Sequence, residues 1–221
     1  MALWVAAGLS PVAGLVAVLL QAVLLWGSGQ RLLGPGFHPL PILGRANRVT
    51  LARSSFVAVL FAFVLDASTA SEWTFSLAVL GIVALILDGV DGALARRDGT
   101  VSQFGGWLDQ EVDAALVACL SLLAWRTGVV GPWILAAGGL RYGFLLLLAA
   151  VPRLRHELPF SQRRRVCCVL QISALLACLV PFLPLALKVT VAALSVSALV
   201  ASFAIDVVRL WRLSTPTHLR P

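Results

Sequence analysis

Four aspartates stand at the ends of two neighbouring apolar segments of the sequence. Asp88 and Asp91 close the first segment within "ILDGVDGALARR", and Asp109 and Asp113 open the next within "GGWLDQEVDAAL". Residues three or four apart lie on one face of a helix, so the members of each pair share a face. Two adjacent antiparallel helices would therefore direct four carboxylates into one shared space.

Such carboxylates are costly in an apolar setting unless their charge is compensated. An aspartate at the membrane centre costs roughly 2.5–3.5 kcal/mol on insertion scales. Four like charges held together also repel, so at least one would be protonated if none were paired. Divalent cations remove both costs, and clustered carboxylate oxygens suit Mg²⁺ or Mn²⁺ better than zinc. Two ions could bridge the four carboxylates and still leave positions for phosphate oxygens.

A simpler interpretation is that each Asp-Gly pair marks a turn and that the aspartates only cap helix ends. That would suffice for a single Asp-Gly pair. Here the residues follow the ordered pattern D-x-x-D-G-x-x-A-R, then eight residues, then G-x-x-x-D-x-x-x-D. Single residue types occur at about 5–8%, so eight fixed positions are not expected to coincide in a chain of 221 residues.

The elements that must position these residues are membrane helices. The chain is 60% hydrophobic and 12% charged, whereas soluble domains average about 45–50% and about 25%. Seven apolar stretches approach the roughly 20 residues that a spanning helix requires. They run approximately over residues 3–26, 49–66, 72–90, 105–125, 130–151, 166–184 and 186–208. The sequence therefore predicts an all-α polytopic membrane protein.

The basic residues predict the orientation of these helices. If the seven segments alternate, fourteen of the seventeen Lys and Arg residues fall on one side. Because basic loops stay in the cytoplasm, we expect the carboxylates and the C-terminus on the cytoplasmic side of a bacterial-type inner or plasma membrane. The net charge of +7 fits this topology and an attraction to anionic headgroups. No basic soluble module is present that would favour nucleic-acid binding.

The aspartate pattern resembles the signature of the CDP-alcohol phosphatidyltransferase family. All eight signature positions carry the expected residue, namely Asp88, Asp91, Gly92, Ala95, Arg96, Gly105, Asp109 and Asp113. Upstream, "NRVTLAR" is similar to the Asn-x-x-Thr-x-x-Arg that commonly opens the family's first core helix, and it supplies Asn47, Thr50 and Arg53. The resemblance implies a six-helix catalytic membrane domain over residues 47–221. Residues 1–46 would add an extra N-terminal transmembrane helix and a cytoplasmic loop.

The resemblance also implies an enzyme of phospholipid biosynthesis, in which an alcohol hydroxyl displaces CMP from a CDP-linked donor. By analogy, Asp88, Asp91 and Asp109 would hold two Mg²⁺ or Mn²⁺ ions. Asp113 would lie near the metal site and act as general base. Arg96 would pair with the diphosphate, a geometry that suits a guanidinium. The nucleotide- and diphosphate-binding set would comprise Asn47, Thr50, Gly92, Ala95, Arg96 and Gly105.

Several alternatives remain open at this level. We expect CDP-diacylglycerol as the donor, but the signature is shared by enzymes that use a soluble CDP-alcohol and a lipid acceptor. A divalent-cation transporter is an alternative of another class, which the fixed positive charge of Arg96 beside the aspartates disfavours. A catalytically inactive scaffold is disfavoured by the intact signature. The resemblance further implies a homodimer.

Evidence about the acceptor comes from arginines. The stretch "PRLRHELPFSQRRR" between the fifth and sixth segments has an ordinary interpretation as a topology signal and a contact for anionic lipid. Alternatively, one or two of its arginines bind a phosphorylated alcohol such as glycerol phosphate or inositol phosphate, because Arg binds phosphate through paired donors. The acceptor-binding candidates are Arg53, Arg153, Arg163 and Arg164. Glu111 points to a different face of its helix from Asp109 and Asp113 and is interpreted as a structural ion-pair partner or an interfacial residue rather than a catalytic one. Arg141 and Asp206, which also lie within segments, are interpreted either as cavity-lining groups or as interhelical contacts.

Overall fold

A computed structural model describes residues 8–33, 44–154 and 161–214. The described part of the chain is helical and contains no strand. Its α-helices are α2 (Pro11–Leu33), α3 (Arg45–Leu65), α4 (Ala67–Glu72), α5 (Thr74–Arg97), α6 (Gln103–Arg126), α7 (Leu135–Ala150), α8 (Gln162–Leu179) and α9 (Leu185–Ser214). Two short 3-10 helices precede and follow α7, namely η1 (Pro132–Ile134) and η2 (Pro152–Leu154).

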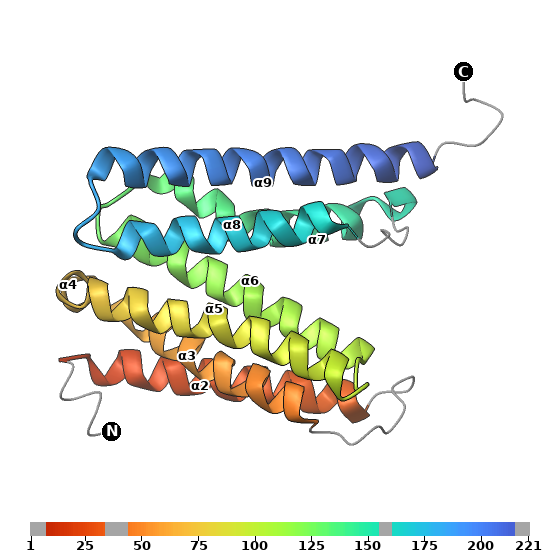
Figure 1. Cartoon of the computed structure of the whole chain (residues 1–221), viewed down its shortest axis with the longest axis horizontal. Coiled ribbons are helices and arrows are strands. Elements are labelled where there is room, and N and C mark those ends of the chain that lie inside the picture. Colours follow the sequence, from red (N-terminus) through yellow and green to blue (C-terminus); the bar gives the residue numbers. More distant parts are fainter. Residues whose placement is uncertain (1–7, 34–43, 155–160, 215–221) are drawn as a thin grey trace.

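Within the described residues, seven long helices correspond one to one with the seven apolar stretches. All except the six-residue α4 run back and forth along one bundle, so that α2 begins at one end and α9 finishes at the other (Figure 1). The first seven residues of the chain and the expected loop over residues 34–43 lie outside the described residues. The extra N-terminal helix therefore extends further along the sequence than expected, to Leu33 rather than to about residue 26.

Four of the helical segments are long and apolar enough to cross a membrane by length and composition. They cover Arg45–Leu65, Thr74–Arg97, Pro132–Ala150 and Leu185–Leu213. Large apolar side chains are exposed along the outer faces of these helices, for example Ile86, Leu146 and Leu194. Such faces suit lipid rather than water, so the protein is an integral membrane protein with an all-α polytopic fold.

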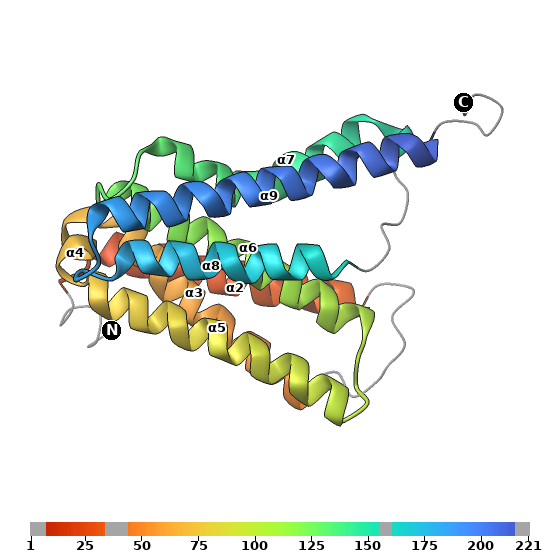
Figure 2. The same cartoon turned by 45° about the horizontal axis from the view of Figure 1, so that its top comes forward.

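Helix α6 forms the centre of the bundle. It runs obliquely between α2, α3 and α5 on one side and α7, α8 and α9 on the other (Figures 1 and 2). Leu108, Leu116, Leu120 and Leu123 of this helix are almost fully buried. On α7, a Cβ added at Gly138 would lie 2.8 Å from the Cα of Ala118, so the glycine allows α7 to pack closely against α6. Small residues at such crossings are typical of membrane helix packing.

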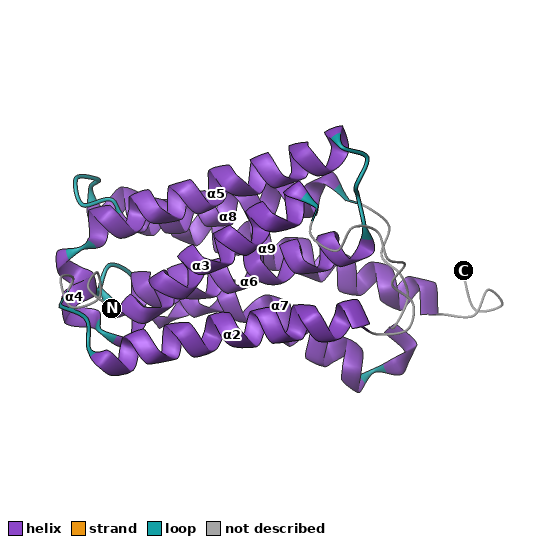
Figure 3. Cartoon of the chain, turned by 90° about the horizontal axis from the view of Figure 1, so that it is seen from below, coloured by secondary structure: helices purple, strands orange, loops and turns teal. Residues whose placement is uncertain are grey.

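Helix α2 lies along one edge of the bundle and packs mainly on α3 (Figure 3). Its Gln21 side chain donates a 2.9 Å hydrogen bond to Ser54 Oγ. Near its start, the backbone N–H of Ser10 donates to Asp66 Oδ2 at 3.2 Å, at the junction of α3 and α4. Two polar contacts therefore attach the N-terminal helix to the core.

Two helix ends differ from their expected positions, and both bear on the aspartates. Helix α5 continues to Arg97 rather than to about residue 90, and its last turn is closed by Asp98 N donating to Leu94 O at 2.9 Å. Helix α6 begins at Gln103, where Ser102 Oγ accepts a 3.0 Å hydrogen bond from Gly105 N. The aspartates thus lie inside regular helix, where their spacing fixes their direction.

Candidate active site

The four aspartates converge on one side chain, Arg53 of α3. Its Nη1 atom is hydrogen bonded to Asp88 Oδ1 and lies 3.6 Å from Asp91 Oδ2. Its Nη2 atom lies 2.8 Å from Asp109 Oδ1 and 3.2 Å from Asp113 Oδ1. The Arg53 side chain has no exposed surface, so a single buried guanidinium joins the carboxylates of α5 to those of α6.

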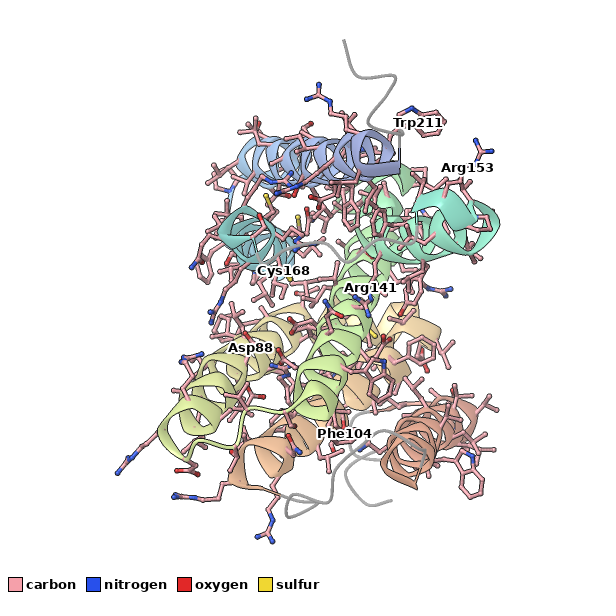
Figure 4. The ribbon with its side chains drawn as sticks, turned by 90° about the vertical axis from the view of Figure 1, so that its right-hand side faces the viewer. Asp88, Phe104, Arg141, Arg153, Cys168 and Trp211 are labelled. Carbon is pink, nitrogen blue, oxygen red and sulfur yellow. The ribbon has the colours of Figure 1, made fainter. Side chains whose placement is uncertain are left out.

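Helical spacing explains why the carboxylates meet there. Asp88 and Asp91 are three residues apart on α5, and Asp109 and Asp113 are four apart on α6, so each pair shares a face. Figure 4 looks along the bundle from the end at which α5 finishes, and it places Asp88 on the side of α5 that faces α6. Exposure of the side chain rises from 5% at Asp91 to 43% at Asp109, so the cluster is open on its Asp109 side.

Helix α3 supplies a second polar contact. The Thr50 hydroxyl, one turn before Arg53, donates a 2.7 Å hydrogen bond to Asp91 Oδ2. Both Thr50 and Asp91 are buried, at 3% and 4% exposure. The most deeply buried carboxylate of the cluster is therefore held in place by a neutral donor as well as by the nearby guanidinium.

The donor set fits a divalent metal ion. Asp88, Asp91 and Asp109 each present a carboxylate oxygen, and these atoms lie within 4.8 Å of one another. Asp113 Oδ1 is buried and accepts no hydrogen bond. One guanidinium cannot neutralise more than one of four carboxylates, and clustered carboxylate oxygens are the ligands that Mg²⁺ and Mn²⁺ prefer. The residues present thus have both the surplus charge and the oxygen ligands that such ions require.

The small residues of the signature leave room around the cluster. A Cβ added at Gly92 would lie 3.3 Å from Nη1 of Arg96, so the arginine folds back along α5 over the glycine. A Cβ added at Gly105 would lie 3.0 Å from Oδ1 of Asn47, which brings the start of α6 against the start of α3. Ala95 is partly buried on α5. Asn47, Thr50 and the signature residues therefore surround a single region at one end of the bundle.

The other arginines that the sequence suggested for acceptor binding lie in different parts of the bundle. Arg153 is exposed on η2, and Figure 4 shows it on the far side of the bundle from Asp88. Arg163 of α8 forms a 2.5 Å ion pair with Asp206 of α9, and it donates a further 2.6 Å hydrogen bond to the Ser202 carbonyl. Arg164 is half-buried on the same turn of α8. The structure does not bring Arg153 to the aspartate cluster.

Glu111 and Arg141 form a separate ion pair. Arg141 Nη2 lies 2.5 Å from Glu111 Oε1, which links α7 to the face of α6 that lies away from Asp109 and Asp113. This agrees with the interpretation of Glu111 as a structural ion-pair partner. Asp206 likewise has an interhelical partner, Arg163. The first pair links α6 to α7, and the second links α8 to α9. Among the described residues, neither pair forms an ion pair with the aspartate cluster.

Sequence reasoning missed two features of this site. The first is the central position of Arg53, for which the available signal was an isolated charge inside an otherwise apolar stretch. The second is Cys168 of α8, which lies on the side of α8 toward α5 (Figure 4), and α8 packs against both α5 and α6. Helix α8 therefore adjoins the cluster from a third direction.

Comparison with models of protein families identifies a match that covers most of the chain. The family model described as CDP-alcohol phosphatidyltransferase matches residues 43–208, which include every residue of the aspartate cluster and the helices from α3 to most of α9. No curated protein and no solved structure matches the chain.

Proposed function

Because the chain belongs to the CDP-alcohol phosphatidyltransferase family, we propose that it transfers a phosphatidyl group from CDP-diacylglycerol to an alcohol acceptor and releases CMP. Members of this family are transferases of phospholipid biosynthesis that move phosphoalcohol groups, with CDP-alcohol substrates, lipid acceptors and a divalent metal. The observation that carries the proposal is the convergence of Asp88, Asp91, Asp109 and Asp113 on one site.

The four aspartates have distinct proposed roles. Asp88, Asp91 and Asp109 hold two Mg²⁺ or Mn²⁺ ions, with Asp113 at the edge of the set. Bound metal would neutralise charge on the phosphate oxygens during transfer. Thr50 fixes the direction of Asp91 through its hydrogen bond. Fixed orientation of a ligand by a second residue commonly governs how well a metal site works.

Asp113 is the proposed general base. In the reaction, the acceptor hydroxyl oxygen forms a bond to the phosphorus that carries the diacylglycerol. The bond from that phosphorus to the CMP oxygen breaks, and CMP leaves with the electron pair. Asp113 takes the hydroxyl proton, and its Oδ1 atom suits this role because it is buried and accepts no other hydrogen bond. A base must lie within hydrogen-bonding reach of the proton that it removes.

The signature residues around the cluster bind the nucleotide end of the donor in this proposal. Arg96 pairs with the diphosphate, and Gly92 supports this role because it leaves space for the guanidinium to lie along α5. Gly105 lets Asn47 approach the start of α6, where both contact the nucleotide. Thr50 and Ala95 complete the wall of this site.

We propose that the site opens to the cytoplasm of a bacterial-type inner or plasma membrane. Helices α5 and α9 finish and α3, α6 and α8 begin at the same end of the bundle (Figure 1). The sequence places Arg45, Arg48, Arg96, Arg97 and Arg212 at these helix ends. The positive-inside rule assigns such an end to the cytoplasm. The acyl chains of the donor would remain in the lipid while its nucleotide enters from water. A homodimer is proposed on family analogy.

For the acceptor we propose a phosphorylated polyol such as glycerol phosphate or inositol phosphate. Arg163 and Arg164 support this proposal because they lie at the start of α8, which packs against α5 and α6, the helices that carry the four aspartates. Arg153 is a weaker candidate because of its distance from Asp88 in Figure 4. Arg53 was a further acceptor candidate, and its burial between the four aspartates favours a role at the metal site instead.

Arg53 also disfavours the alternative that the protein is a divalent-cation transporter. A fully buried guanidinium that contacts all four carboxylates would oppose the passage of a cation through them.

The identity of the donor is tested by supplying purified protein in nanodiscs with CDP-diacylglycerol, or with a soluble CDP-alcohol plus diacylglycerol. Mass spectrometry then identifies the product. A new phospholipid from the first mixture supports the proposal, whereas product from the second mixture alone would assign the chain to the other half of the family.

A further inference from the structure

Arg53 contacts the same carboxylates that would bind a divalent ion. Its two Nη atoms contact all four aspartates. Three of these, Asp88, Asp91 and Asp109, form the group whose oxygens lie close enough together to share an ion. A guanidinium and a metal ion bound to one set of carboxylates repel each other strongly at the low effective dielectric of a protein interior.

We propose that Arg53 is a tethered counter-cation of the metal site. It compensates part of the carboxylate charge when no divalent ion is bound, and it weakens metal binding by competing for the same oxygens. This inference rests on the metal-dependent function proposed above. It assigns to Arg53 the setting of metal affinity, in place of the acceptor binding expected from the sequence.

The local geometry favours competition over a purely structural ion pair. Arg53 Nε and Asp113 Oδ1 are both buried without a hydrogen-bond partner. A site built for the guanidinium alone would be expected to satisfy these atoms, because an unpaired buried polar group destabilises the fold. The ion pair of Arg53 with the cluster therefore leaves buried polar atoms unsatisfied. A metal ion that takes over Asp88 and Asp109 must also break the guanidinium's hydrogen bonds to these two carboxylates, so the two cations compete directly for them.

Competition has a definite thermodynamic sign. If the guanidinium and the metal ion oppose each other, the coupling is reciprocal, so removal of the guanidinium must tighten metal binding. Removal also leaves four like charges uncompensated, so it must destabilise the protein when no divalent ion is present. Removal of an arginine with a purely structural role would destabilise the metal-free protein but would leave the affinity for the metal ion unchanged.

The test is a Mn²⁺ titration of the full-length protein in detergent, followed by the electron paramagnetic resonance signal of free Mn²⁺. We expect Arg53→Gln to lower the Kd for Mn²⁺ by roughly tenfold relative to wild type. Thermal unfolding measured in parallel should show a lower Tm for Arg53→Gln in EDTA and a larger rise in Tm on addition of Mn²⁺. Neither readout depends on enzymatic activity.

Two further variants separate charge from structure. Arg141→Gln removes another arginine from a helix–helix ion pair, its contact with Glu111, and should leave the Kd for Mn²⁺ unchanged. Arg53→Lys keeps one positive charge but cannot reach carboxylates on both sides as the forked guanidinium does. Its Kd should lie between those of wild type and Arg53→Gln.

Each outcome bears on one claim. If wild type binds no Mn²⁺, the metal-dependent function itself is overturned. If wild type binds Mn²⁺ and Arg53→Gln binds it equally or more weakly, only the counter-cation inference fails. Recovery of folded Arg53→Gln only in the presence of a divalent ion supports the inference. Failure of that variant to fold even with Mn²⁺ contradicts it, because the ion should substitute for the missing charge.

Discussion

The Thr50 hydroxyl donates a 2.7 Å hydrogen bond to Asp91 Oδ2, and both side chains are buried between α3 and α5. A carboxylate that ligates metal through one oxygen can be oriented through the other. The contact therefore ties the "NRVTLAR" segment to the aspartate signature although the two residues stand 41 positions apart.

Replacement of Thr50 by Val should weaken metal binding and slow turnover. Loss of the donor frees Asp91 to rotate, and loss of such supporting contacts commonly costs about 10–100-fold in metal affinity or activity. Thr50→Ser keeps the hydroxyl and should retain most of both. The comparison is made by Mn²⁺ titration and by CMP release, with exposed Ser55→Ala as the matched control on the same helix. Equal metal affinity in Thr50→Val and wild type would remove Thr50 from the metal site.

Asp113→Asn should lower turnover by about 10²–10⁴-fold, the usual contribution of a positioned general base. The affinity for a CDP-containing donor should change little, because Asp88, Asp91 and Asp109 remain in place. Single-turnover kinetics together with equilibrium binding of CDP separate these quantities. A variant that loses CDP affinity but keeps its turnover rate would reassign Asp113 to metal binding alone.

Gly105→Ala should raise the KM for the CDP-linked donor. The new Cβ would lie 3.0 Å from Asn47 Oδ1 and 3.2 Å from Ser102 Oγ, so the start of α6 and the start of α3 must separate or Asn47 must turn away. Gly106→Ala is a matched control on the same turn, because its added Cβ would meet nothing within 4 Å. In a helix, each change to Ala by itself stabilises by roughly 0.5–1 kcal/mol. An unchanged KM in Gly105→Ala would show that the contact with Asn47 has no part in donor binding.

Asp66 should make the stability of the N-terminal attachment dependent on pH. The backbone N–H of Ser10 donates to its carboxylate and lowers the pKa of Asp66 below its ordinary value of 3.8, and burial opposes this shift. A group with a lowered pKa in the folded state stabilises that state above its unfolded-state pKa, and this contribution is lost as the pH falls through the folded-state value. The protection factor of the Ser10 amide, which corrects for the pH dependence of intrinsic exchange, should therefore fall below about pH 3.8 in wild type. In Asp66→Asn the protection factor should already be lower at pH 7 and should lack this acid step; an acid step of equal size in both proteins would contradict the assignment.

The sequence predicted the helices of the fold because each apolar stretch approaches the length of a spanning helix and is separated from the next by charged residues or by glycine and proline. Hydropathy alone ends this helix at about residue 90, because its last two turns are more polar, so hydropathy did not indicate that α5 reaches Arg97. The short α4, η1 and η2 were also missed, because each is fixed by local packing rather than by periodicity.

The sequence likewise predicted the location of the site but not all of the residues that meet there. Regular spacing along α5 and α6 was enough to bring four carboxylates to one region, because helix geometry converts spacing into direction. The position of Arg53 could not be derived in this way, since it depends on how α3 packs against both helices. The same holds for Arg163, whose pairing with Asp206 requires the antiparallel packing of α8 on α9. The roles of the individual residues stay predictions until they are tested by mutation.

The most direct test of the central claim is metal-dependent release of CMP from CDP-diacylglycerol. Purified wild-type protein in nanodiscs is supplied with a panel of alcohols and phosphorylated alcohols, first in EDTA and then with Mg²⁺ or Mn²⁺ restored, beside Asp91→Asn. The account predicts CMP and a new phospholipid in equal amounts with at least one acceptor, loss of both in EDTA, recovery with metal, and no product from Asp91→Asn. Turnover that persists undiminished in EDTA, or in Asp91→Asn, would contradict the claim that the aspartate cluster is a metal-dependent active site.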